Sequence, residues 1–175
     1  VVAIGATGND DGSGHVKIYQ NNNGSWQQIG DDIDGEAAGD QSGYSVSLSA
    51  DGSVVAIGAP WNDDGDGYDR GHVRVYKLSD KNESDPLPEA IQIGGDIDGE
   101  DADDLSGWSV SLSADGSVVA IGAMRNDGNG EDSGHVRIYQ NNNGSWEQIG
   151  EDIDGEAADD QAGWSVSLSA DGSVV

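Results

Sequence analysis

An acidic segment, Asp-Ile-Asp-Gly-Glu followed four residues later by a further Asp, occurs three times in the chain. Carboxylates that alternate around a glycine turn can converge on Ca²⁺, which takes about six to eight oxygen ligands. The spacing is not that of an EF-hand loop, and a hairpin bend with Ile33 inward and the acids in solvent is the alternative. The calcium hypothesis assigns these ligands: Asp32, Asp34, Glu36, Asp40, Asp96, Asp98, Glu100, Asp104, Asp152, Asp154, Glu156 and Asp160.

Three Asn-x-Ser motifs begin at Asn23, Asn82 and Asn143. Asn-x-Ser is the acceptor motif for N-glycosylation in secreted proteins. The Asn-Gly pair at Asn23 and Asn143 also favours a tight hairpin turn, which offers a structural explanation for those two copies. Asn82 precedes Glu instead of Gly, so that explanation does not extend to it. We therefore expect N-linked glycans at all three sites if the source is eukaryotic.

The sequence offers little support for a catalytic site. The equivalent histidines His15, His72 and His135 each precede a valine expected to face inward, and no second His or Cys accompanies any of them. They are interpreted as structural. The repeated serines lie outside any Gly-x-Ser-x-Gly nucleophile elbow, and we expect them to point outward from a strand. We predict no catalytic residue and no organic cofactor.

The tryptophans fall into two groups. Trp26, Trp108, Trp146 and Trp164 recur at equivalent repeat positions, which indicates core packing or packing between repeats. Trp61 occurs once, in the longer second repeat. It is the aromatic residue that we expect to contact a partner.

Composition limits the function classes. The 175 residues include 34 acidic and 7 basic side chains, a net charge of −27, with 28 glycines and no cysteine. So few cations disfavour binding to nucleic acid or to anionic membranes. The lack of cysteine excludes disulfides and thiolate metal sites, and no apolar run approaches the roughly 20 residues of a membrane helix. The acid excess is also typical of a high-salt habitat. Because the chain starts within an apolar run, we interpret it as a piece of a longer protein.

Internal repeats organise the chain. The string VVAIGA starts at positions 1, 54 and 118, and its first two residues return at 174. We therefore divide a single repeat region, 1–175, into repeats 1–53, 54–117 and 118–173, with 174–175 starting another. The extra residues of the second repeat fall in polar stretches, where loops tolerate insertion.

The sequence pattern of each repeat predicts four short strands. In Tyr44–Ser49 apolar residues alternate with serines, and Val54–Ala59 is apolar throughout, as expected for a strand covered on both faces. His72–Tyr76 alternates again, and Ser25–Ile29 follows an Asn-Gly turn. The expected fold class is all-β, with tandem four-stranded antiparallel blades in a β-propeller-like arrangement. Closed propellers typically need about four to eight blades, so three repeats indicate part of a larger propeller, an assembly of chains, or an open stack.

The run from Ser42 to Pro60 resembles the FG-GAP repeat, which builds the integrin-α-type β-propeller and many secreted microbial proteins. The following segment, Gly71–Tyr76, is similar to the Gly-x-Val-x-Val-Tyr strand of that family. The family's Phe-Gly pair is replaced here by Ser-Gly or Ala-Gly. The family's calcium-binding turn holds several acids, whereas the matching turn here holds only Asp51, so that metal site is not carried over.

These observations favour a non-enzymatic structural or adhesive repeat protein, extracellular or on the cell surface, as a subunit or segment of an array or filament. Its expected partners are further copies of itself, neighbouring repeats, or an extracellular protein or glycan, with no nucleic acid and no membrane insertion. Two alternatives stay open. One is a calcium-stabilised ligand-binding propeller resembling the integrin-α head, and the other is a propeller domain attached to an enzyme.

Overall fold

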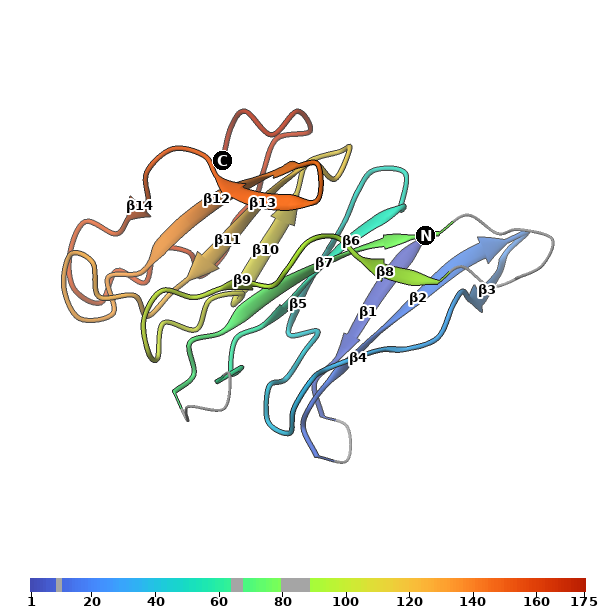
Figure 1. Cartoon of the computed structure of the whole chain (residues 1–175), viewed down its shortest axis with the longest axis horizontal. Helices are drawn as coiled ribbons and strands as arrows, with labels where there is room; N and C mark the ends of the chain where they lie inside the picture. Colours follow the sequence, from blue (N-terminus) through green and yellow to red (C-terminus); the bar gives the residue numbers. More distant parts are fainter. Residues whose placement is uncertain (9–10, 64–67, 80–88) are drawn as a thin grey trace.

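The computed structural model describes residues 1–8, 11–63, 68–79 and 89–175. Three antiparallel sheets lie side by side and succeed one another along the chain (Figure 1). The predicted all-β, propeller-like class is confirmed. The described part of the chain contains no helix long and apolar enough to cross a membrane.

The strands of each sheet follow in sequence order. The first sheet contains β1 (Val2–Ala6), β2 (His15–Asn22), β3 (Ser25–Gln28) and β4 (Ile33–Asp34). The second contains β5 (Ser45–Leu48), β6 (Val54–Ala59), β7 (His72–Leu78), β8 (Ala90–Gln92) and β9 (Ile97–Asp98). The third contains β10 (Ser109–Leu112), β11 (Val118–Ala123), β12 (His135–Asn142), β13 (Ser145–Gln148) and β14 (Ile153–Asp154).

Two features differ from the strand pattern expected of a repeat. The acidic segments add the two-residue strands β4, β9 and β14, which pair with β2, β7 and β12 next to the predicted fourth strand. A strand of two residues is too short to show a hydrophobic periodicity in the sequence. In addition, the strand that ends repeat 1–53 is β5, which belongs to the second sheet. Repeats 1–53 and 54–117 therefore each contribute a strand, β5 and β10, to the sheet that follows.

Apolar side chains fill the space between neighbouring sheets. Every residue of β6 and β11 is buried, as expected of strands covered on both faces. Val16 of the first sheet and Ile57 of the second share one core cluster. Val75 of the second sheet and Ile121 of the third share another. The core is thus divided between two junctions, which we call the first–second and second–third junctions.

The serines of the inner strands correct one expectation. The Ser45 hydroxyl donates a hydrogen bond of 2.7 Å to the carbonyl oxygen of Gly107, and Ser109 makes the equivalent bond to Gly163. The Ser47 oxygen accepts from the backbone N–H of Leu112 at 3.0 Å. The prediction that these serines point outward is wrong, because the next inner strand lies close against their face. They connect one repeat to the next.

The turn between the first two strands of a sheet is held by one aspartate. Asp51 accepts hydrogen bonds from the Ser49 hydroxyl at 2.7 Å, the Ser53 hydroxyl at 2.7 Å and the Ser53 backbone N–H at 2.9 Å. The Ser53 N–H, then the two hydroxyls, lower the Asp51 pKa from 3.8 to about 2. The equivalent Asp171 also has a pKa of about 2, and the pKa of Asp115 is lowered too.

These depressed pKa values predict acid sensitivity. Stability from the Asp51 and Asp171 turns is present above pH 3.8 and is lost as the pH falls toward about 2, because the folded state must then take up a proton that it binds weakly. The lowered pKa of Asp115 acts in the same direction. The triple variant Asp51→Asn, Asp115→Asn, Asp171→Asn should be less stable than wild type near neutrality, and the difference should shrink across that window. Urea midpoints measured at several pH values check this. A difference that is constant with pH would contradict it.

Candidate functional site

Polar side chains from two neighbouring sheets meet at each junction. At the first–second junction Glu36, which follows β4, lies beside His72 of β7 and Asp96, which precedes β9. The second–third junction repeats this arrangement with Glu100, His135 and Asp152. In each group the nitrogen and oxygen atoms that could hold a metal lie within 4.8 Å of one another. The glutamate and the aspartate therefore come from successive acidic segments.

An arginine bridges the carboxylates of each group. Arg137 pairs through Nη2 with Glu100 Oε1 and through Nε with Asp152 Oδ1, the latter at 3.1 Å. Arg74 makes the corresponding ion pairs with Glu36 and Asp96. The two arginine side chains are only 13% and 12% exposed. They balance charge where acids from two sheets converge, and they join one sheet to the next.

The first sheet carries a simpler version of this cluster. Lys17 stands in place of the arginine and lies 3.2 Å from Asp32, and the group also contains His15 and Asp34. Hydrogen bonding from Gln28, followed by Lys17, lowers the pKa of Asp32. Both carboxylates of this group come from one acidic segment.

Two histidines are buried at the junctions. The side chains of His72 and His135 are 3% exposed, and the Nδ1 atom of each has no hydrogen-bond partner. Nδ1 lies 3.8 Å from Asp96 Oδ2 in the first case and 3.7 Å from Asp152 Oδ2 in the second. Sequence reasoning treated these histidines as structural. No local motif shows that an aspartate of the same sheet and a glutamate of the neighbouring one would face them.

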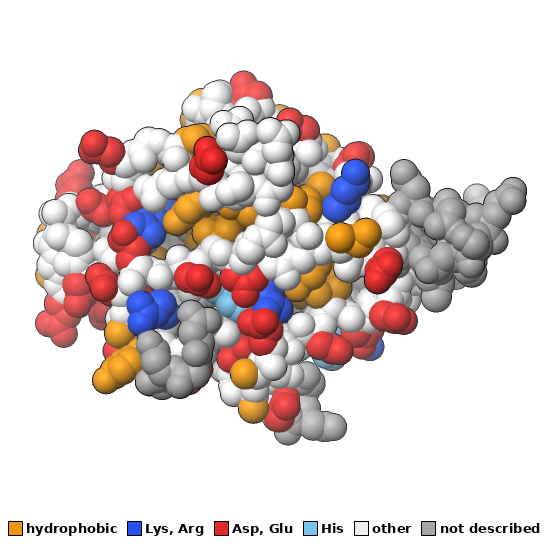
Figure 2. Space-filling view, viewed as in Figure 1, with side chains coloured by type: hydrophobic (Ala, Val, Ile, Leu, Met, Phe, Trp, Pro, Cys, Tyr) orange, Lys and Arg blue, Asp and Glu red, His pale blue; other side chains and the backbone are white. Residues whose placement is uncertain are grey.

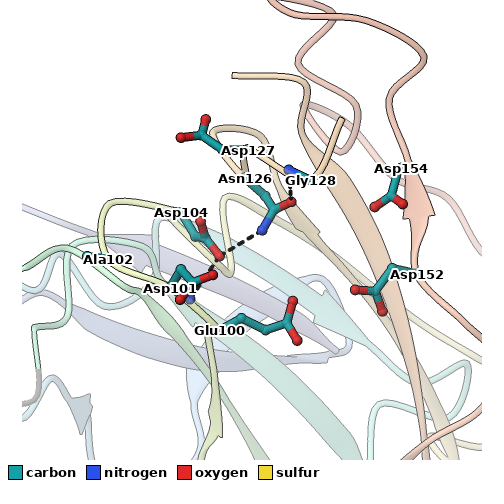
Figure 3. Close-up of a pocket in the computed structure, with 9 residues that line it drawn as sticks. All are labelled: Glu100, Asp101, Ala102, Asp104, Asn126, Asp127, Gly128, Asp152 and Asp154. Atoms are coloured by element: carbon teal, nitrogen blue, oxygen red, sulfur yellow. Dashed lines mark hydrogen bonds between the residues drawn. The ribbon is translucent and has the colours of Figure 1, made fainter. Parts of the chain in front are cut away.

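An acidic cleft opens at the second–third junction. Its volume is about 510 Å³, and its lining includes Glu100, Asp104, Asp152 and Asp154. Figure 3 shows the side chains of Glu100 and Asp152 facing one another across it. Figure 2 shows Asp and Glu side chains spread over the visible face, with Lys and Arg side chains scattered among them. The cleft suits a cation far better than an anion.

The remaining predicted ligands have other surroundings. The buried Asp104 accepts hydrogen bonds from Asn126 Nδ2 and from the Asp101 N–H, each at 3.1 Å, and burial raises its pKa. Asp40 bonds the side chain of Asn62 in the same way. These two residues fasten the loop after one sheet to the next sheet, a role that sequence reasoning missed. Asp34, Asp98 and Asp154 lie opposite the three histidines in the strand register, while Glu156 and Asp160 are exposed.

Two of the three glycosylation candidates lie at exposed hairpin tips. Asn23 joins β2 to β3 and Asn143 joins β12 to β13, with positive φ angles of 53° and 55° that suit an Asn-Gly turn. Asn82 lies outside the described residues. Glycosylation of all three stays a prediction.

The aromatic side chains pack across repeats. Trp108 lies 4.6 Å from Tyr44 and 5.2 Å from Trp164 between ring centroids, which confirms the expected packing of Trp108 and Trp164. The Trp61 ring centroid lies 5.0 Å from that of Tyr44 and 5.6 Å from that of Trp108. Part of the Trp61 side chain therefore packs against other aromatic residues of the same chain. Its contact with a partner stays a prediction.

The other two tryptophans differ from each other. Trp146 donates from Nε1 to the carbonyl of Ile93, which follows β8 of the second sheet, at 2.8 Å, as packing between repeats requires. Trp26 occupies the same position in the first sheet but is 54% exposed. The expectation of packing is wrong for Trp26, because no described sheet lies on that face.

Comparison with known proteins identifies the repeats. The FG-GAP repeat family matches residues 33–76 and 97–139. No curated protein matches the chain by sequence. One solved structure that matches is named as a 6-phosphogluconolactonase from Bacteroides uniformis, with 16% identity and a TM-score of 0.48. The match covers 81% of this chain but only 37% of that protein. At this level the likeness carries no argument about function.

Proposed function

Because the chain belongs to the FG-GAP repeat family, we propose that it is a non-enzymatic structural or adhesive segment of an extracellular array or filament. The observation that carries this proposal is the role of the polar residues that recur between repeats. The inner-strand serines, the bridging arginines and the buried asparagines all join one repeat to the next. A chain whose recurrent polar residues hold repeats together is suited to load-bearing or display.

The recurrence of the polar clusters also argues against an enzyme. Among the described residues, the two Glu–His–Asp groups at the junctions have the same residue types in the same places, and the first sheet holds a related His–Asp–Asp group. A catalytic centre instead depends on a particular nucleophile, base and orienting group brought together at one site. The exposed Asn23 and Asn143 are consistent with an extracellular, glycosylated surface.

Further repeats, in this protein or in another copy, are the proposed partners. On the first sheet Val2, Ile4, Tyr19 and Trp26 line an apolar hollow of about 440 Å³. The equivalent residues Tyr139 and Trp146 of the third sheet pack against the core cluster at the second–third junction. The hollow therefore has the chemistry of a junction surface, and another sheet would cover it in the same way.

Electron microscopy and sedimentation of the purified chain at near-neutral pH test this proposal. We expect fibres or concentration-dependent oligomers, which the double variant Ile4→Ser, Trp26→Ser should abolish. The matched control is Ile91→Ser, since Ile91 is also 54% exposed but does not line the hollow. Monomers at all concentrations, or assembly unaffected by the double variant, would contradict self-association. Discrete rings would favour the ligand-binding propeller.

A further inference from the structure

The buried Nδ1 atoms at the junctions need an explanation. A buried nitrogen without a hydrogen-bond partner is costly and uncommon in folded proteins. Here the same unpartnered atom occurs at two equivalent histidines, and each faces an aspartate oxygen at 3.7–3.8 Å. That separation is too long for a hydrogen bond. A ligand held between the histidine Nδ1 and the aspartate oxygen would give both atoms a partner.

The separations fit a small metal ion. Two ligands on a tetrahedral Zn²⁺, each bonded at about 2.0–2.2 Å, lie roughly 3.3–3.6 Å apart. His135 Nδ1 and Asp152 Oδ2 are 3.7 Å apart, and a Glu100 oxygen completes a group whose atoms all lie within 4.8 Å. Small side-chain rotations would bring the three atoms onto one ion. The adjoining cleft of about 510 Å³ can supply a water molecule for a fourth position.

The donor set selects the class of metal. Ca²⁺ takes oxygen ligands alone, whereas an imidazole nitrogen with carboxylates suits Zn²⁺ and its first-row neighbours. We propose that Glu100, His135 and Asp152 form a site for a divalent transition metal of the Zn²⁺ class. Such an ion would connect the second and third sheets, because Glu100 follows one and His135 belongs to the other. This inference does not depend on the proposed function.

Arg137 does not block the site. Its ion pairs are with Glu100 Oε1 and Asp152 Oδ1, which leaves Asp152 Oδ2, the oxygen that faces His135. It would orient the carboxylates from outside, as residues beyond the ligands commonly do in metal sites. At the first–second junction Arg74 contacts Asp96 Oδ2, the same oxygen that faces His72. We therefore expect one tight site per chain, at His135, and weaker binding at His72.

Calorimetric titration of the full chain with ZnCl₂, in millimolar CaCl₂ to occupy non-specific acidic sites, tests the proposal. We expect one Zn²⁺ per chain. His135→Phe should abolish this binding while His72→Phe, at the equivalent buried position, leaves it intact. Glu100→Gln should weaken it by at least about tenfold. Glu156→Gln, at the equivalent position of the third acidic segment and outside the group, should not.

A spectroscopic readout covers the case in which His135→Phe fails to fold. Co²⁺ bound at the site should give visible absorption bands of a nitrogen and oxygen environment, and Glu100→Gln should diminish them while Glu156→Gln does not. Zn²⁺ binding that calcium displaces, that survives in His135→Phe, or that responds equally to the two glutamate variants would overturn the proposal. The groups would then be an acidic surface with no specific metal site.

Discussion

Replacing Gly58 by alanine should destabilise the protein by about 3 kcal/mol or more. Gly58 lies in β6, where a Cβ would overlap the backbone carbonyl of Gly107 and the Ser45 hydroxyl. The same carbonyl accepts the Ser45 hydrogen bond between repeats. Backbone atoms cannot rotate away as a side chain can, so the second and third sheets would have to separate. Overpacking of this kind costs stability and loosens the junction.

Urea unfolding of Gly58→Ala beside Gly95→Ala checks this expectation. Gly95 has no atom within 4 Å of an added Cβ, and its φ is not positive, so alanine should be tolerated there within about 0.5 kcal/mol. Gly122→Ala should match Gly58→Ala, because its Cβ would overlap the carbonyl of Gly163. Equal stabilities of Gly58→Ala and Gly95→Ala would show that the sheets do not approach as closely as described.

Replacing Arg137 by glutamine should cost about 2 kcal/mol at low salt. The arginine is 13% exposed and pairs with Glu100 and Asp152, which are 43% and 26% exposed. Without it these carboxylates repel each other and the other acids of the cleft, in a chain of net charge −27. The partial exposure of Glu100 keeps the effect below that of a fully buried ion pair.

The dependence on salt separates this effect from a simple loss of packing. The Arg137→Gln penalty should fall between about 0.05 M and about 0.5 M NaCl, because salt screens repulsion between partly exposed acids. Arg137→Lys should recover part of the lost stability, since lysine restores the positive charge but not the simultaneous contact with both carboxylates. Arg125→Gln, an equal charge change at an exposed position, is the control. A penalty no larger than that of Arg125→Gln would contradict the bridging role.

The strand content was predictable because it depends on local patterns. Alternation predicts β5 and β7, a continuous apolar run predicts β6, and an Asn-Gly turn locates the β2–β3 hairpin. These signals lie within about ten residues of one another. The recurrence of VVAIGA then showed that one pattern repeats through the chain. Fold class could therefore be argued without any tertiary information.

The junctions could not be predicted, because their contacts join different repeats. Glu100 and His135 lie in different sheets, and only the stacking of those sheets brings them together. The inner-strand serines have the alternating pattern of a solvent-facing side, yet a neighbouring inner strand covers them. In the second acidic segment Glu100 belongs to the group at the second–third junction, whereas Asp96 belongs to the group at the first–second junction. In the sequence the segment therefore resembles a single metal-binding loop, although its residues belong to separate clusters in the structure.

The coupling between Glu100 and Arg137 is the most direct test of the claim that shared polar residues join the sheets. A double-mutant cycle of Glu100→Gln, Arg137→Gln and the combined variant, measured by urea unfolding in chelator-treated buffer, isolates their interaction. The pair spans the second and third sheets, and we predict a coupling free energy of about 1 kcal/mol at low salt. Additive effects, with coupling below about 0.3 kcal/mol, would contradict the account.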